Sequence, residues 1–527
     1  MAPDDPADAA GGSDADPPPV TLPDPDTRGG VLYAYLEEPA SIDPAGASSP
    51  DEFALVDHVF DSLTRVGASG EVLPAAAESW EPSADLTSFK FRLRADGTFH
   101  DGSAVEAQDF VRAWRRLVEG ADGAVSPSAY LLDVVEGRQR SRGGGILSGV
   151  VAEDDRTLRV DLAMPFAEFP VVAAHPALGP VPPSVNFPSW RERPVGNGPF
   201  AMAEPWQHGR FIRLEAVAEG KDEPTLEQIV YRIYEGEDAE AAGYDDFTRG
   251  NLDVAPVPED ILPLLERDGS DAYAGPGVID GPRAVIAVYA FNTELPPFDD
   301  PRVRQAISLL IDARSFPDLP PEGTRVAARS VVPPGFGGYE PPFCDFCRRD
   351  PTRAEALLAE LEEPLEPIEL AFYDHPDHRP VAEQAQQSVN EVLGPDALQL
   401  RPLSRSVWMA ALREGELGFF LSGWVGEYPS PDAFLYPLLH PSFIGQGNPS
   451  RYASEDVTLL LDEARATADD LARERLYRQA EARALADAVI VPLFFYRHAV
   501  VVAERVQGYR IGPTGLVDLT QVSLVEP

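Results

Sequence analysis

The chain has 527 residues, of which 44% are hydrophobic and 25% are charged, so most of it can fold around sizeable apolar cores. The formal net charge of −44 argues against binding to a nucleic-acid backbone and against docking on anionic lipid, because both partners need a basic surface. Two cysteines exclude a disulfide-dense scaffold and a four-cysteine zinc site, and no apolar run is long enough to predict a transmembrane helix.

Residues 1–28 differ in composition from the rest of the chain. They hold seven aspartates and seven prolines and no aromatic residue. Such a segment buries too little apolar surface to offset the entropy that ordering it would cost. We therefore predict a disordered acidic tether over residues 1–28 that follows a removed leader, with a naturally disordered N-terminus as the alternative.

Beyond residue 28, strand-like alternation and helical spacing follow each other along the whole chain. Strands are predicted at 31–36, 89–94, 158–162, 368–373, 418–421 and 489–496. Helices are predicted at 51–63, 106–118, 303–311, 352–361, 380–393, 407–413, 455–466 and 471–486. Because the two kinds of element are mixed throughout, the fold class is α/β or α+β.

Three short motifs predict local structure. Asp101-Gly102 is a turn dipeptide between a strand and a helix. Gly196 and Gly198 flank Asn197, and these three residues tolerate the positive φ angles of a tight turn. Asp300-Pro301 is typical of a helix start, with the aspartate as N-cap and the proline at the first helical position.

The sequence carries none of the standard catalytic signatures, namely GxSxG, HExxH, GxxxxGK[ST] or GxGxxG. The densest group of ligand-type residues is Asp374-His375-Pro376-Asp377-His378. It could bind a metal, but a solvated loop after a strand is the favoured interpretation, because no second cluster supplies further ligands. We therefore predict neither a metal nor a cofactor.

Cys344 and Cys347 form a CxxC motif with two prolines before it and a helix only near Thr352. A redox centre would need the motif at a helix N-terminus beside a βαβ unit. We therefore predict a short structural disulfide that pins a loop, with a free thiol pair as the second interpretation and catalysis as the third.

Several segments together resemble the family 5 extracellular solute-binding proteins, which are the oligopeptide- and dipeptide-binding components of bacterial ABC importers. The segments are Glu38–Pro44, Phe60–Leu63, Pro74–Trp80, Phe89–Arg94, Phe99–Val105, Ala107–Phe110, Pro194–Phe200, Phe291–Thr293, Pro297–Ile307, Gly423–Trp424 and Pro431–Phe434. They follow one another in the family's order from about Gly29 to about Leu519. A collinear set over nearly the whole chain is far more specific than any one of its motifs.

The resemblance implies a bilobal periplasmic-binding-protein fold, in which two lobes close on a ligand about a hinge. It divides the chain into a discontinuous first lobe, an accessory domain inserted into that lobe, and a second lobe. The first lobe is expected at 29–47, 168–275 and 488–527, the accessory domain at 48–167, and the second lobe at 276–487.

The resemblance also implies a ligand site. Peptide-binding members hold the ligand's α-ammonium with an acid shortly after the Gly-Trp pair, and the matching residue here is Glu427, where the family usually has aspartate. The segments expected to pair with a ligand backbone are Leu421-Ser422-Gly423-Trp424-Val425 on one lobe and Ser48-Ser49-Pro50 on the other. Trp424 is expected to wall the cleft, and Trp408 and His378 are weaker candidates.

One departure from the family pattern concerns the ligand's C-terminus. Relatives can neutralise that carboxylate with basic residues of the second lobe, whereas the residue two before Gly423 is Leu421. Ligand length and C-terminal recognition are therefore left open.

The resulting functional prediction is a monomeric extracellular receptor, periplasmic or held at the cell surface as a lipoprotein. It captures an oligopeptide and delivers it to ABC permease subunits. The alternatives are the same fold with a nickel chelate, sugar or opine as cargo, a secreted hydrolase, and a peptide-sensing or chaperone protein.

Overall fold

The computed structural model describes residues 30–525, apart from 68–69, 122–124, 139–146, 188, 218–223, 263–276, 320–322, 334–335 and 337–338. The predicted tether, residues 1–28, lies outside the described residues. Helices and strands alternate through the described part of the chain, so the mixed fold class is confirmed.

A mixed sheet of eleven strands runs through the molecule in the order β15-β14-β16-β12-β17-β11-β1-β10-β9-β8, and β13 pairs with β17. The strands are β1 (Val31–Glu37), β8 (Phe200–Met202), β9 (Phe211–Ala216), β10 (Gln228–Tyr234), β11 (Val254–Pro256), β12 (Val278–Phe291), β13 (Arg325–Ala327), β14 (Ile368–Tyr373), β15 (Leu398–Leu403), β16 (Phe419–Val425) and β17 (Ile490–Val502). Neighbours in this sheet come from distant parts of the sequence, so the sheet joins the whole chain.

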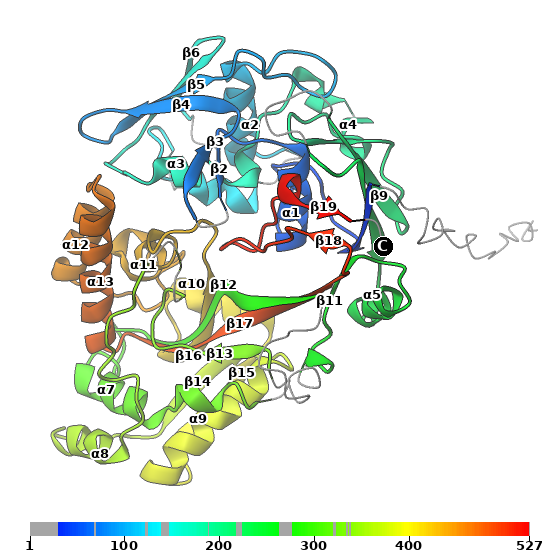
Figure 1. Ribbon diagram of the computed structural model, residues 1–527. Helices are drawn as coiled ribbons and strands as arrows, with labels where there is room; N and C mark the ends of the chain where they lie inside the picture. Colours follow the sequence, from blue (N-terminus) through cyan, green and yellow to red (C-terminus); the bar gives the residue numbers. More distant parts are fainter. Residues whose placement is uncertain are drawn as a thin grey trace, which may run out of the picture.

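The long antiparallel strands β12 and β17 cross the middle of the molecule side by side (Figure 1). At its C-terminal end β17 pairs with β11, whereas the C-terminal half of β12 pairs with β16. Elements drawn in blue and cyan lie on one side of these strands in this view, and α7, α8 and α9 lie on the other (Figure 1). Two continuous strands therefore connect the halves, as a hinge between lobes requires.

A second, antiparallel sheet has the order β4-β5-β7-β6, with β4 (Ala77–Pro82), β5 (Ser88–Leu93), β6 (Val150–Asp154) and β7 (Thr157–Asp161). The predicted alternation is confirmed in β5, where Phe89, Phe91 and Leu93 are buried. Helix α2 (Ala107–Glu119) buries Trp114 against this part of the core. All four strands fall within the range expected for the accessory domain, whose boundaries stay a prediction.

The remaining short strands are β2 (Thr64–Val66), β3 (Val72–Pro74), β18 (Val506–Gln507) and β19 (Ser523–Leu524). The remaining helices are α1 (Pro50–Val59), α3 (Phe169–Val172), α4 (Ser189–Glu192), α5 (Ala239–Thr248), α7 (Pro301–Leu310), α8 (Pro351–Ala359), α9 (His378–Leu393), α10 (Arg405–Glu414), α11 (Asp432–Leu439), α12 (Glu455–Arg465) and α13 (Asp470–Ala486).

Two of the three predicted motifs form as expected, and the third forms for a different reason. The Asp300 side chain caps α7, and Gly102 has a φ of +84° in its turn. Gly196 and Gly198 do not have positive φ, so that part of the prediction is wrong. A Cβ at Gly196 would overlap the carbonyl oxygen of Val59, and Asn197 bonds both backbone groups of Asp61. Close backbone approach is therefore what requires glycine here.

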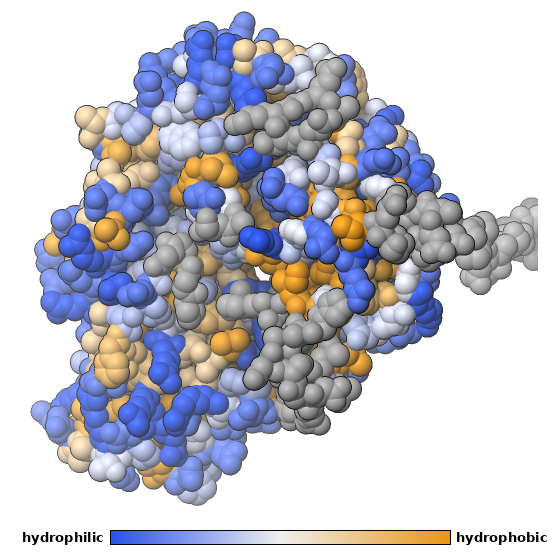
Figure 2. All heavy atoms as spheres, in the orientation of Figure 1, coloured by the Kyte–Doolittle hydropathy of each residue, from blue (hydrophilic) through white to orange (hydrophobic). Residues whose placement is uncertain are grey.

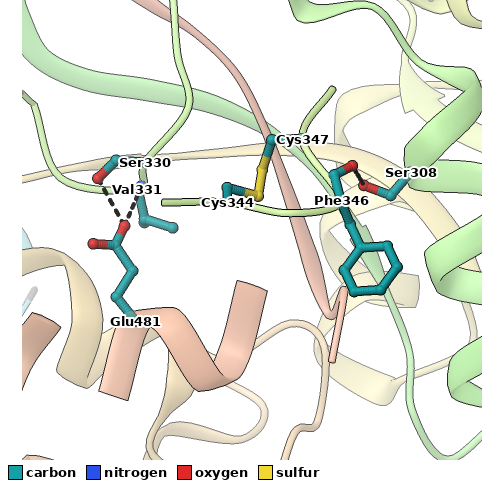
Figure 3. The surroundings of a disulfide bond; sticks show 7 residues. All are labelled: Ser308, Ser330, Val331, Cys344, Phe346, Cys347 and Glu481. Atoms are coloured by element: carbon teal, nitrogen blue, oxygen red, sulfur yellow. Dashed lines mark hydrogen bonds between the residues drawn. A yellow bond between two sulfur atoms is a disulfide. The ribbon is translucent and has the colours of Figure 1, made fainter. Parts of the chain in front are cut away.

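Cys344 and Cys347 are joined in a disulfide with 5.3 Å between their Cα atoms (Figure 3). Hydrogen bonds hold the chain within the disulfide and in the segment that precedes it. The Phe346 carbonyl accepts a hydrogen bond from Ser308, and the nearby Glu481 carboxylate accepts hydrogen bonds from the Ser330 hydroxyl and the Val331 N–H (Figure 3). This arrangement corresponds to a pinned loop.

A buried ion pair joins Asp432 at the start of α11 to Arg465 at the end of α12. Arg465 Nε and Nη2 lie 2.8 and 2.7 Å from the two Asp432 oxygens, and the two side chains are 4% and 0% exposed. Tyr428 and Tyr477 donate further hydrogen bonds to Asp432. Each of these two buried charges is stabilised by the other, because a buried charge without its partner raises the free energy of the folded state.

Replacing Arg465 with methionine should lower the free energy of unfolding by about 3–5 kcal/mol, because it leaves the Asp432 carboxylate buried without its cation. Denaturant unfolding followed by circular dichroism measures this loss. The matched control is Lys90→Met, which breaks an ion pair between Lys90 and Glu153. Their side chains are 53% and 32% exposed, respectively. That control should cost about 1 kcal/mol or less, and an equally small loss for Arg465→Met would contradict the prediction.

Acid should destabilise the protein through His58, which is 5% exposed and lies parallel to the Tyr231 ring. Burial lowers the pKa of His58 from its usual 6.5 to about 4. Above pH 6.5 the residue is neutral in both the folded and the unfolded chain. Between pH 6.5 and 4 the unfolded chain binds a proton that the folded chain does not, so the stability that neutral His58 supports is lost as the pH falls.

The loss attributable to His58 should approach about 3 kcal/mol at pH 4 and level off below that pH. It is measured as the difference between the stability–pH curves of wild type and His58→Gln, which cancels the titration of other groups. Parallel curves from pH 7 to 4 would show that His58 is not the acid-sensitive group.

Candidate functional site

A cavity of about 440 Å³ lies where β12, β16 and β17 meet the ends of β14, α9 and α10. Its lining includes eight of the residues predicted from the sequence, which are Leu421, Ser422, Gly423, Trp424, Val425, Glu427, Trp408 and His378. Hydrophobic side chains gather around a hollow in the middle of the face shown in Figure 2. Residues far apart in the sequence therefore converge on one concave site, the usual location for ligand binding.

Strand β16 has an edge that its neighbour covers only in part. It pairs with β12 over its whole length, from Val425 to Phe419. On its other side β14 pairs only with Phe419 and Phe420 and then diverges. Within the described residues, the stretch Leu421–Val425 has no strand partner on that side.

The hydrogen-bond alternation shows which backbone groups face this open edge. The Gly426 N–H donates to the Ala284 carbonyl of β12. Because the groups of successive residues alternate in direction along an antiparallel strand, those of Gly423 and Val425 face away from β12. Both residues are exposed, Val425 at 47%. The open edge can therefore accept an extended backbone.

Trp424 is fixed beside this edge. Its indole Nε1–H donates to the Ala433 carbonyl at 2.6 Å, and a Cβ placed at Gly447 would lie 3.1 Å from its ring. The cavity is also lined by Trp408 of α10, whose buried Nε1 has no hydrogen-bond acceptor in the described part of the chain.

Glu427 lies just beyond the C-terminal end of β16, and its side chain is 22% exposed. Its Oε2 atom lies 3.2 Å from His175 Nε2 but, among the residues described, accepts no hydrogen bond of good geometry. The pKa of Tyr130 is raised well above its ordinary value, mainly by burial. The Glu427 carboxylate, which accepts a hydrogen bond from the phenol, raises it further. The carboxylate thus has acceptor capacity left for a ligand donor.

The sequence reasoning missed Tyr130 and His175. Tyr130 belongs to the 3₁₀ segment Pro127–Leu132, and His175 lies between α3 and the next short helix. His175 Nδ1 accepts the Ala177 N–H at 3.1 Å, which leaves Nε2 to carry the proton of the neutral ring and to face Glu427. Nothing in the local pattern around either residue points to a carboxylate so distant in the sequence.

Ser48, Ser49 and Pro50 do not line the cavity. They form the N-terminus of α1, where the Ser49 side chain caps the helix and Pro50 takes the first helical position. The Glu52 carboxylate accepts the N–H groups of Ser48 and Ser49. Their pairing with a ligand stays a prediction.

The segment Asp374–His378 forms a loop and the start of α9. Asp374 pairs with Arg379, and His378 Nδ1 lies 3.1 Å from the Tyr373 carbonyl oxygen. Burial lowers the pKa of His378. In the part of the chain that the structure describes, no group of three histidine, cysteine or acidic side chains is placed to hold a metal ion.

The family model for bacterial extracellular solute-binding proteins, family 5 (middle region), matches residues 71–446, well over half of the chain. The chain is a family 5 extracellular solute-binding protein. The resemblance predicted from the sequence motifs is thereby confirmed.

Three relatives illustrate the family. The chain is 29% identical to the dipeptide-binding protein DppE of Bacillus subtilis over 93% of this chain and 91% of that protein. It is 28% identical to the probable deoxycholate-binding periplasmic protein YgiS of Escherichia coli, over 88% of this chain and 87% of that protein. The unliganded open form of the periplasmic murein tripeptide-binding protein MppA superposes with a TM-score of 0.81 at 25% identity, covering 94% of this chain and 97% of that one.

The superposition confirms the bilobal periplasmic binding-protein fold over nearly the full length of the chain. Among the described residues, no helix combines the length and apolarity needed to cross a membrane.

Proposed function

We propose that this protein captures a short peptide with a free amino terminus between its two lobes and delivers it to the permease subunits of an ABC importer. The observation that carries the proposal is the open edge of β16 with the Glu427 carboxylate at its end, whose Oε2 atom accepts no hydrogen bond from the described residues. A peptide can pair with the Gly423 and Val425 backbone whatever its sequence, and its ammonium can meet Glu427. The names of relatives such as DppE and MppA support a peptide as cargo.

A non-peptide cargo is the second candidate, because the relative YgiS is named for deoxycholate. A rigid steroid has no row of alternating amides to satisfy the donors and acceptors of a strand edge. The exposed backbone of Gly423 and Val425 therefore favours a peptide over such a ligand.

The proposal includes closure of the lobes. The match to an unliganded open form supports an open arrangement of this chain, with Ser48–Pro50 away from the cavity. Closure about β12 and β17 would bring the first lobe toward the open edge of β16 and shield the ligand from water. Captured ligand would then leave slowly.

Three finer parts of the proposal concern the state of the protein. It acts without a catalytic step, as a monomer, and residues 1–28 tether it to the cell surface through a lipid-modified cysteine at the N-terminus of the mature protein. Equal recovery of the native protein with and without detergent after cell lysis would contradict the lipid anchor.

Replacing Glu427 with glutamine should weaken binding of free-amino peptides by about 1.5–3 kcal/mol, since it removes the charged partner of the ammonium. Isothermal titration with a tri- to pentapeptide mixture and its N-acetylated counterpart measures the effect. Wild type should prefer the free peptides, and the variant should lose that preference. Glu463→Gln, an exposed glutamate on α12, is the matched control. Unchanged affinity in Glu427→Gln would remove the anchor role.

A further inference from the structure

The face of β16 that carries Gly423 lacks side-chain volume where a bound peptide would lie. Gly423 pairs directly with Ala287 of β12, so the two smallest side chains of this region are neighbours across the strands. Ala287 pairs in turn with Phe494 of β17. Side chains of directly paired residues lie on the same face of a sheet. The depression over Gly423 and Ala287 is therefore bounded by a large aromatic ring.

Helix α9 closes the same face. The Tyr289 hydroxyl, from the residue two beyond Ala287 and hence on its face, donates to the Val381 carbonyl of α9 at 2.7 Å. Val381, Leu421 and Phe494 belong with Ala287 to one buried apolar cluster, and Tyr496 packs against it. All of them line the cavity. The depression thus has a floor of glycine and alanine and walls of valine, leucine, phenylalanine and tyrosine.

The charged residues at the cavity also determine which kind of ligand side chain suits the depression. Among the described residues, the cavity lining includes the carboxylate of Glu427 and no lysine or arginine, and the Arg325 guanidinium lies 5.2 Å from the centroid of the Phe494 ring. A neutral polar ligand side chain would give up its water for these apolar walls. A large apolar side chain would instead gain the free energy of leaving water.

We propose that this depression is a selective subsite for one large apolar side chain, aromatic or branched aliphatic, of the bound peptide. The inference rests on the proposed function and deepens it. Backbone pairing alone would bind peptides regardless of their sequence, whereas this subsite would select the side chain at one position of the peptide. The ligand residues directly before and after this position point to the other face of the added strand, so their side chains do not enter the depression.

The test is a positional scan with free-amino tetrapeptides of alanine, each carrying leucine, phenylalanine or glutamine at one position. Isothermal titration to the wild-type protein should show one position where leucine and phenylalanine bind about 10- to 100-fold tighter than alanine. Glutamine at that position should bind no tighter than alanine.

The decisive variant is Ala287→Leu, which fills the floor of the depression from a position that pairs with Gly423 on one side and with Phe494 on the other. It should abolish the preference for leucine and phenylalanine at that position. Leu459→Ala, an exposed residue on α12, is the control. If Ala287→Leu fails to fold by circular dichroism, Phe494→Leu, which widens one wall, should shift the preference from leucine toward phenylalanine.

The outcomes separate the two claims. Binding of none of the tetrapeptides would overturn the proposed function itself. Binding of all of them within threefold of one another, or a preference that persists in Ala287→Leu, would overturn the apolar subsite and leave peptide capture standing.

Discussion

The divergence of β14 from β16 after Phe420 is the feature on which the site depends. An unpaired strand edge usually invites association with other chains, and proteins cover or interrupt such edges. Here the edge lies inside a cavity of about 440 Å³. An extended ligand that enters the cavity can pair with the backbone donors and acceptors of this edge. The same unpaired edge that elsewhere would promote aggregation can therefore bind a ligand here.

A rigid frame holds the two groups that act with this edge. The Trp424 indole bonds the Ala433 carbonyl of α11, and Glu427 is followed at once by Tyr428, which donates to Asp432. Asp432 is in turn held by the buried Arg465. Because the ion pair fixes the start of α11, it fixes the strand end and the turn that carries the carboxylate.

Much of the fold follows from local patterns, and the site does so only in part. Alternation placed the strand around Phe89–Leu93, and Asp300-Pro301 marked a helix start, because both depend on neighbours in sequence. The motif around Gly423 and Trp424 located the cavity residues of β16 together with Glu427. His175 and Tyr130 were missed because only the tertiary fold brings them to Glu427. The role of Gly196 was misjudged because the Val59 carbonyl that crowds it comes from another segment.

The most direct test of the central claim is hydrogen–deuterium exchange of the peptide fragments covering residues 419–428, with and without a saturating mixture of free-amino tri- and tetrapeptides. A backbone that pairs with β16 should slow exchange of the Gly423 and Val425 amides and leave the exposed amides of α12 unchanged. Bound peptide with unchanged exchange over 419–428 would show that the open edge of β16 does not receive the ligand.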